Sequence, residues 1–259
     1  MTVSTRDLAV VTRFNSGLFW RDRAALTTSV ALFLGLGIGL PFMMDRLVAS
    51  VQPGVVLDTH LGVLATVLTV ATFQQIVLTL TARRDQLLLK RMRATGLGDR
   101  DILGGEILNL VLQSTALTAV VSVALYTLTD LPVPGNPLLY AVSVVACAAV
   151  MCLLGAAFTA AVPRSELAAP MAMPFFLLTG IGAGGFGPLL QFLPGWVTAI
   201  LGLLPGSALV EAARVAYTGN GGLAGDLRAV AVPALKLAVW AAVGLFATVR
   251  WFRWESRKS

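Results

Sequence analysis

Gly182, Gly184 and Gly187 have the GxGxxG spacing of loops that bind dinucleotides. Such a loop holds a pyrophosphate only where a strand precedes it and a helix follows it. Here the glycines end a long apolar run, so the match is a coincidence of spacing. A phosphate loop is also missing, because none of the three lysines follows a glycine. The chain itself is therefore not expected to hold ATP or any other cofactor.

Residues 96–99 read GLGD, a pattern also found in intramembrane aspartyl proteases. Those enzymes need the aspartate inside the membrane beside a second catalytic aspartate. Asp99 lies in a basic loop and no apolar run contains a partner aspartate, so an intramembrane enzyme is disfavoured. His60 is the single histidine, which excludes an HExxH zinc site. Cys147 and Cys152 share one apolar run and lack metal-ligand spacing, so no metal site is expected.

The composition is that of an integral membrane protein. Of 259 residues, 57% are hydrophobic and only 12% are charged, whereas soluble domains carry about 25% charged residues. The net charge of +6 does not indicate nucleic-acid binding, because the basic residues cluster at the ends of apolar runs.

Crossing the hydrocarbon core takes about 20 apolar residues in a helix. The sequence therefore predicts an all-α, polytopic membrane protein with six spans. The predicted spans are residues 24–44, 60–82, 103–128, 138–162, 167–185 and 230–249. Residues 1–23 alternate arginines with apolar side chains at helical spacing, which predicts a helix lying in the membrane interface.

Basic residues are distributed unequally between the two sides of this arrangement. The side with both termini and residues 83–102 carries 15 Lys and Arg, and the other side carries three. The positive-inside rule places the first side in the cytoplasm. A seventh span at residues 188–204 would put the basic C-terminal tail outside, so the charge count rejects it.

Strongly polar side chains occur within three of the predicted spans, and one of them is Lys236, within residues 230–249. Gln74 and Gln75 lie deep in the second span, and Glu106, Asn109 and Gln113 share one face of the third. Glu106 lies near the cytoplasmic boundary, where water could solvate it. Polar groups in membrane helices either bond to neighbouring helices or line a watery path. Both readings stay open for Gln74, Gln75, Asn109 and Gln113.

The basic loop at residues 83–102 contains a stretch, 85–95, that predicts a short amphipathic helix. Leu87, Leu88, Met92 and Leu97 could form its apolar edge, and Gly96 follows where the helix would end. An amphipathic helix on the surface of a membrane protein either lies on lipid or docks a soluble partner.

Residues 188–219 are apolar but interrupted by prolines. The longest unbroken piece covers about half of a span, which predicts two short helices dipping into or lying on the outer membrane face. Trp196 would anchor at the interface. Glu211 and Arg214 are three residues apart, on one side of the second helix.

Two stretches, residues 83–108 and 177–214, resemble the permease subunits of ABC type-2 transporters, the group that includes daunorubicin-type drug exporters. The basic loop is similar to the family's cytoplasmic coupling region, and Pro194, Trp196, Pro205, Glu211 and Arg214 match its outer segment. Gly96 stands where many members have proline.

The resemblance implies that two permease copies, expected as a homodimer, form one pathway in a bacterial inner membrane. Two copies of a separate ATPase, which would bind ATP and Mg²⁺, would dock on the basic loop and drive export of a hydrophobic or amphiphilic drug. Lipid or polysaccharide-precursor export and ion extrusion are alternatives. A non-transport protein whose basic helix binds anionic lipid is another. The implied coupling residues are Arg84, Asp85, Leu88, Leu89, Arg91, Met92, Arg93, Thr95 and Leu97.

Overall fold

The computed structural model describes residue 12 and residues 23–47, 54–94, 96, 98–219, 223–252 and 254. Every regular element in this part of the chain is helical, which confirms the predicted all-α class. The elements are α2 (Arg23–Leu47), α3 (Val55–Thr69), the π-helix η1 (Val70–Gln74), α4 (Gln75–Asp85), α5 (Leu88–Ala94), α6 (Asp99–Leu128), α7 (Pro137–Phe158), η2 (Ser165–Leu167), α8 (Ala168–Gly182), η3 (Pro188–Phe192), α9 (Gly195–Leu201), α10 (Pro205–Thr218) and α11 (Leu223–Trp251). The predicted interfacial helix at residues 1–23 lies almost wholly outside the described residues.

Five helical stretches of the described chain are long and apolar enough to cross a membrane. They are Val55–Asp85, Asp99–Leu128, Pro137–Phe158, Ser165–Gly182 and Gly225–Trp251. A sixth is reached if α9 and α10, which meet at an angle of 80°, count as one broken span. Separately, α2, over the first predicted span, is a 25-residue helix packed on α3 and α6.

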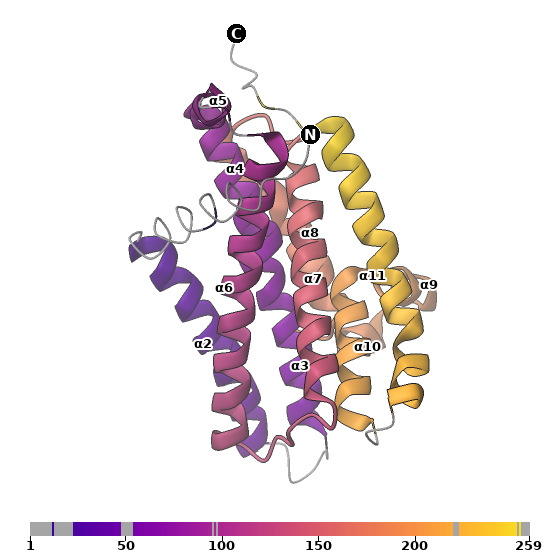
Figure 1. Cartoon of the computed structure of the whole chain (residues 1–259). Coiled ribbons are helices and arrows are strands. Elements are labelled where there is room, and N and C mark those ends of the chain that lie inside the picture. The colour runs from indigo at the N-terminus through magenta and orange to yellow at the C-terminus, as the bar shows by residue number, and fades with distance from the viewer. Residues whose placement is uncertain are drawn as a thin grey trace.

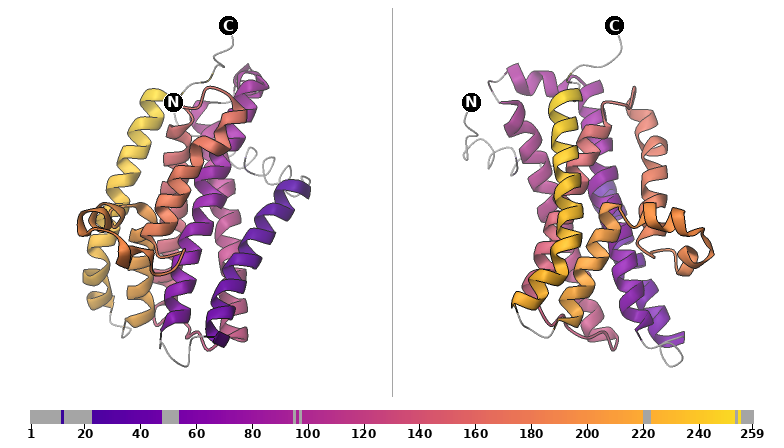
Figure 2. Two further views of the ribbon diagram at one scale, coloured as in Figure 1. Left: turned by 180° about the vertical axis from the view of Figure 1, so that it is seen from behind. Right: turned by 90° about the vertical axis from the view of Figure 1, so that its right-hand side faces the viewer.

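The long helices run side by side, as Figure 1 shows. One end of the bundle, the α5 end, carries α5 and the end of α11; the opposite end carries the turn from α6 to α7. In Figure 2, α8 stops part-way along the bundle, and the segment with η3 and α9 projects sideways. The chain then continues in α10 to the opposite end. Together α8 and α10 cover the length that one helix covers elsewhere.

Contacts along α10 fix its position inside the bundle. The Cys147 thiol, in the middle of α7, donates to the Pro205 carbonyl at 3.6 Å. At the other end of α10, the Asn136 N–H donates to the Ala216 carbonyl at 2.9 Å. The helix packs on α3, α7, α8 and α11. The sequence predicted that residues 188–219 form two short helices that dip into or lie on the outer membrane face. In the structure α10 packs inside the bundle beyond the end of α8, and its bend with α9 is that of a broken span or a re-entrant loop.

The glycine-rich stretch after α8 is the turn that makes this break possible. Gly184 and Gly187 have positive φ of 78° and 82°, which favours glycine over residues with a Cβ atom. A Cβ atom on Gly62 of α3 would lie 2.7 Å from the Gly184 carbonyl carbon, so the two backbones touch. The GxGxxG spacing thus reflects close backbone packing.

The core is centred on the π-helix that joins α3 to α4. Phe73, 2% exposed, stacks on Phe175 with ring centroids 4.1 Å apart. A Cβ atom on Gly155 would lie 2.7 Å from the Phe73 carbonyl oxygen, so α7 approaches closely here. π-helical turns occur frequently at functional sites.

Candidate functional site

The basic loop begins with a break between α4 and α5. The helix expected over residues 85–95 is instead α5, Leu88–Ala94, and α4 extends to Asp85. Leu87 between them has a φ of 59°, a left-handed conformation that costs about 1–2 kcal/mol for a residue with a Cβ atom. The break turns the chain so that Arg84 and Asp85 no longer share a helix with Arg91 and Arg93.

Arg84 and Asp85 bind the connector that joins α7 to α8. Arg84 is only 3% exposed, and its guanidinium donates to the carbonyls of Thr159 at 3.1 Å and Val162 at 2.6 Å. The Asp85 carboxylate accepts from the Ser165 N–H at 2.8 Å. Hydrogen bonds with one charged partner are the strong ones in proteins. This clasp therefore joins the two loops of the α5 end into one unit.

The short helix α5 has one buried face and one charged face. Leu89 is fully buried in the core, and Met92, three residues later, packs against it. Leu88 is half-buried, whereas Leu87, expected on the apolar edge, is 48% exposed. The exposed residues of α5 are Lys90, Arg91, Arg93 and Ala94. Thr95 and Leu97 lie outside the described residues.

Arg93 connects α5 to the start of α6 and to Trp254 near the end of the chain. Its guanidinium forms an ion pair of 2.8 Å with Asp99, in the first turn of α6, where the helix dipole favours a carboxylate. The same group lies 4.9 Å from the ring centroid of Trp254, in cation–π contact. Arg93 therefore holds the end of the loop in place, and Arg91 is exposed on the same helix.

A buried ion pair joins α4 to α6 beneath the loop. Arg83 and Glu106 lie 2.8 Å apart, and their side chains are 12% and 3% exposed. Glu106 is therefore paired inside the protein and is not solvated at a boundary. With the Arg84 clasp, this pair makes α4 a rigid connection between the basic loop and the bundle.

The four residues predicted to line a pathway lie on three elements: Gln74 ends η1, Gln75 begins α4, and Asn109 and Gln113 are in α6, which packs on both. Asn109 is buried, and Gln74, Gln75 and Gln113 are half-buried. The side-chain oxygen of Gln113 is buried without a hydrogen-bond partner. Their role in a pathway stays a prediction.

Lys236 of α11 holds the bend between α9 and α10. Its ammonium group lies 2.7 and 2.8 Å from the two carboxylate oxygens of Glu211 and donates to the Gly202 carbonyl at 2.9 Å. One turn further along α11, the Trp240 indole donates to the Leu203 carbonyl at 2.6 Å. A broken helix leaves carbonyls that an apolar environment cannot satisfy. Lys236 and Trp240 satisfy them, which explains a lysine inside an apolar run.

The other residues of the predicted outer segment differ in exposure. Pro194 precedes α9 and Pro205 begins α10, where a missing N–H costs nothing. Trp196 is 69% exposed, and its role as an interface anchor stays a prediction. Arg214 forms an ion pair of 2.8 Å with Asp58 of α3. In α10, Glu211 and Arg214 thus contact two different helices.

Sequence reasoning missed a cluster that contains all three tyrosines and the only histidine. The Tyr140 hydroxyl lies 3.2 Å from the His60 ring nitrogen Nε2 and 3.0 Å from the Ser122 hydroxyl. Tyr126 and Tyr217 pair through their hydroxyls at 2.8 Å. These residues come from α3, α6, α7 and α10. The cluster was missed because these residues are far apart in the sequence. Each tyrosine nevertheless lies in the part of its helix that is at the opposite end of the bundle, where α6 turns into α7.

Removing the Tyr140 hydroxyl should destabilise this cluster. In Tyr140→Phe, His60 and Ser122 each lose a buried partner, so we expect a loss of about 1–3 kcal/mol of unfolding free energy. Tyr126→Phe removes one bond at a half-buried position and should cost less. Thermal unfolding of the purified variants measures both, and equal midpoints for Tyr140→Phe and wild type would contradict the assignment.

Among the described residues, no group of three or more His, Cys, Asp and Glu side chains could hold a metal ion. The candidate functional site is the charged helix α5 together with the contacts that fix it to the bundle.

Comparison with known families gives one match. The family model for the ABC-2 type transporter matches residues 6–218, which include the basic loop, the α8 break and α10. No curated protein matches the chain. Domains of this family are transmembrane subunits that are not themselves catalytic and normally work with an ABC ATPase partner. The chain belongs to the ABC-2 type transporter family and is a multi-pass permease subunit of an ABC transporter.

Proposed function

We propose that this permease exports a hydrophobic or amphiphilic compound of the drug type, driven by ATPase subunits that dock on α5. The observation that carries the proposal is the exposed basic face of α5, formed by Lys90, Arg91 and Arg93, on a loop tied to the bundle. The Arg84 clasp and the Arg83–Glu106 pair let a force on α5 reach α4, α6 and the α7–α8 connector. A rigid element of this kind can transmit a rigid-body shift.

In this proposal two copies of the chain, as a homodimer, enclose the pathway. Each copy receives one ATPase subunit, which holds ATP and Mg²⁺, and closure of the ATPase pair displaces α5 in both copies. The α5 end and both termini face the cytoplasm of a bacterium. The strong excess of basic residues on that side supports this orientation in the inner membrane.

The polar residues inside the bundle support an uncharged or weakly polar substrate. Gln74, Gln75, Asn109 and Gln113 are uncharged amides. Two charged side chains within the predicted spans are engaged in ion pairs: Glu106 with Arg83, and Lys236 with Glu211. A pathway lined by amides among apolar side chains can pass an amphiphile, whereas a small ion would lose its hydration without charged ligands in return.

Reconstitution tests the proposed function. The permease, purified with its ATPase, is placed in vesicles, and ATP-dependent transport is measured for a fluorescent anthracycline, a labelled lipid and a monovalent cation. We expect ATP-dependent movement of the anthracycline. Movement of only the lipid or the ion would replace the drug assignment. No movement of any of the three would contradict the proposed substrate class.

A further inference from the structure

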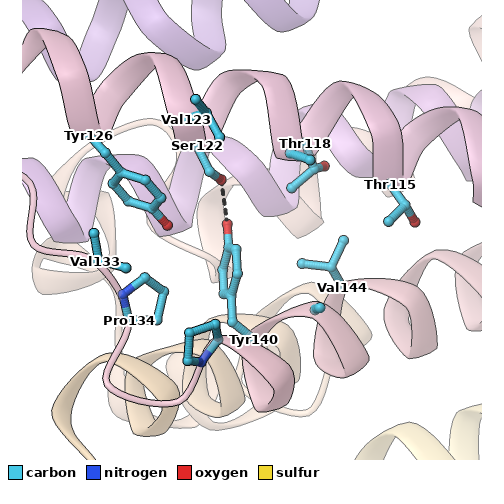
Figure 3. Close-up of a pocket in the computed structure, with 12 residues that line it drawn as sticks. Thr115, Thr118, Ser122, Val123, Tyr126, Val133, Pro134, Tyr140 and Val144 are labelled. Atoms are coloured by element: carbon cyan, nitrogen blue, oxygen red, sulfur yellow. Dashed lines mark hydrogen bonds between the residues drawn. The ribbon is translucent and has the colours of Figure 1, made fainter.

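A slot opens between α6 and α7 towards the opposite end of the bundle. It has a volume of about 210 Å³. Its rim is formed by exposed side chains, among them Ala119 and Val123 of α6 and Ala141 of α7, and its floor by buried residues such as Tyr140 and Val144. Figure 3 shows its lining residues along the two helices, from Thr115 at one end to Tyr126 and the Val133–Pro134 loop at the other.

The wall of the slot is almost entirely apolar although several of its residues carry hydroxyl groups. Two of these hydroxyl groups are engaged with each other: the Ser122 and Tyr140 hydroxyls are hydrogen-bonded at 3.0 Å, as the dashed line in Figure 3 marks. The Tyr126 hydroxyl bonds to Tyr217 at 2.8 Å. Because these hydroxyl groups are hydrogen-bonded, ring faces and methyl groups form the wall of the slot. They also fix the Tyr140 ring, because its hydroxyl contacts His60 as well.

The dimensions of the slot suit one hydrocarbon chain. Thr115 and Tyr126 are eleven positions apart on α6, which corresponds to about 16 Å at the rise of an α-helix. One leaflet contributes about 15 Å to the hydrocarbon core of a bilayer. The volume is below the 300–1,000 Å³ of pockets that hold drug-sized ligands, so a whole drug molecule does not fit.

We propose that this slot binds one acyl chain of a phospholipid from the leaflet at the opposite end of the bundle. Apolar cavities of this kind stay dry and take up apolar molecules. The slot opens on an exposed apolar face of two helices of membrane-spanning length, so lipid chains are its immediate surroundings. A chain in the slot regains the dispersion contacts that an unfilled wall would lose. The lipid headgroup lies beyond the Val133–Pro134 loop. The proposal rests on the membrane placement of the helices and not on the substrate.

Photolabelling tests this site. The permease is reconstituted in phosphatidylcholine that carries a diazirine in the middle of one acyl chain, irradiated and mapped by mass spectrometry. We expect several-fold more adducts on the slot residues of α6 and α7 than on the lipid-exposed face of α11 around Leu235. Ala141→Phe fills the slot from its rim and should lower the slot adducts to the α11 level. Val142→Phe, at an exposed position that does not line the slot, should leave them unchanged.

A second filling variant, Ala119→Phe on α6, repeats the test from the other rim. Thermal unfolding of each variant shows whether it is folded. The adduct yield of a filling variant that is folded then tests the proposed site. Equal adduct yields on the slot and on α11, or slot labelling that survives both filling substitutions, would overturn the proposal. This readout needs neither ATP nor transport, so its failure is separate from failure of the proposed function.

Discussion

Replacing Lys236 with methionine is expected to lower the unfolding free energy by about 2–3 kcal/mol, near the lower end of what breaking a buried ion pair costs. The substitution keeps the length of the side chain but leaves the Glu211 carboxylate without its cation and the Gly202 carbonyl without its donor. Glu211 is 43% exposed, which is why we expect the lower end of the range. For a chain of this size the loss corresponds to a thermal midpoint lower by about 5–10 °C.

A double variant tests the ion pair between Lys236 and Glu211. In the double variant Lys236→Met, Glu211→Leu no carboxylate is left without a partner, so most of the lost stability should return, and only the Gly202 bond stays broken. Leu235→Met, at the adjacent exposed position, is the control and should unfold like wild type. If Lys236→Met unfolds at the same temperature as Leu235→Met, then Lys236 does not hold the bend between α9 and α10.

Replacing Arg84 with alanine is expected to abolish transport while the ATPase stays bound. The substitution removes both bonds to the α7–α8 connector, at a cost of about 3–6 kcal/mol, because each was a hydrogen bond from a charged donor. The exposed face of α5 is unchanged, so docking should survive. A displacement of α5 would no longer move the connector and α8. We therefore expect ATP hydrolysis without movement of substrate.

The variant Arg84→Lys should lose less transport than Arg84→Ala. An ammonium group is a point charge and cannot bridge two carbonyls as a guanidinium does, so we expect partial transport. Arg250→Ala, at an exposed arginine near the end of α11, is the control. The measurement is the ratio of substrate transported to ATP hydrolysed in vesicles. A wild-type ratio for Arg84→Ala would show that the clasp takes no part in coupling.

The sequence predicted the helical class and the membrane-length runs well, because apolar length depends on local composition alone. It did not predict the break at Leu87, since leucine carries no preference for positive φ. The helix predicted over residues 85–95 therefore includes Asp85, whereas Asp85 and its neighbour Arg84 bind the connector. Only the tertiary structure shows that the carbonyls of Thr159 and Val162 need a donor.

Partners that are distant in sequence were beyond the reach of pattern reasoning. The sequence shows Lys236 as a charge inside an apolar run, but it does not show that Glu211, in a separate short helix, is its partner. The prediction that residues 188–219 dip into or lie on the outer membrane face rests on three prolines, which break helices but do not say where the pieces pack. The tyrosine cluster was missed for the same reason, because its members come from four elements that are separated in the sequence.

The central claim is that the basic face of α5 is where the ATPase docks, and binding of the ATPase to variants of this face tests it most directly. In Arg91→Glu the charge is reversed at an exposed residue while the Arg93–Asp99 pair stays intact. In Arg91→Glu, Arg93→Glu both are reversed, and Arg250→Glu is the matched control at the same end of the bundle. The account predicts that the amount of ATPase purified with the permease falls strongly in the single variant, is lost in the double variant and is unchanged in the control. Full ATPase binding by the folded double variant would contradict it.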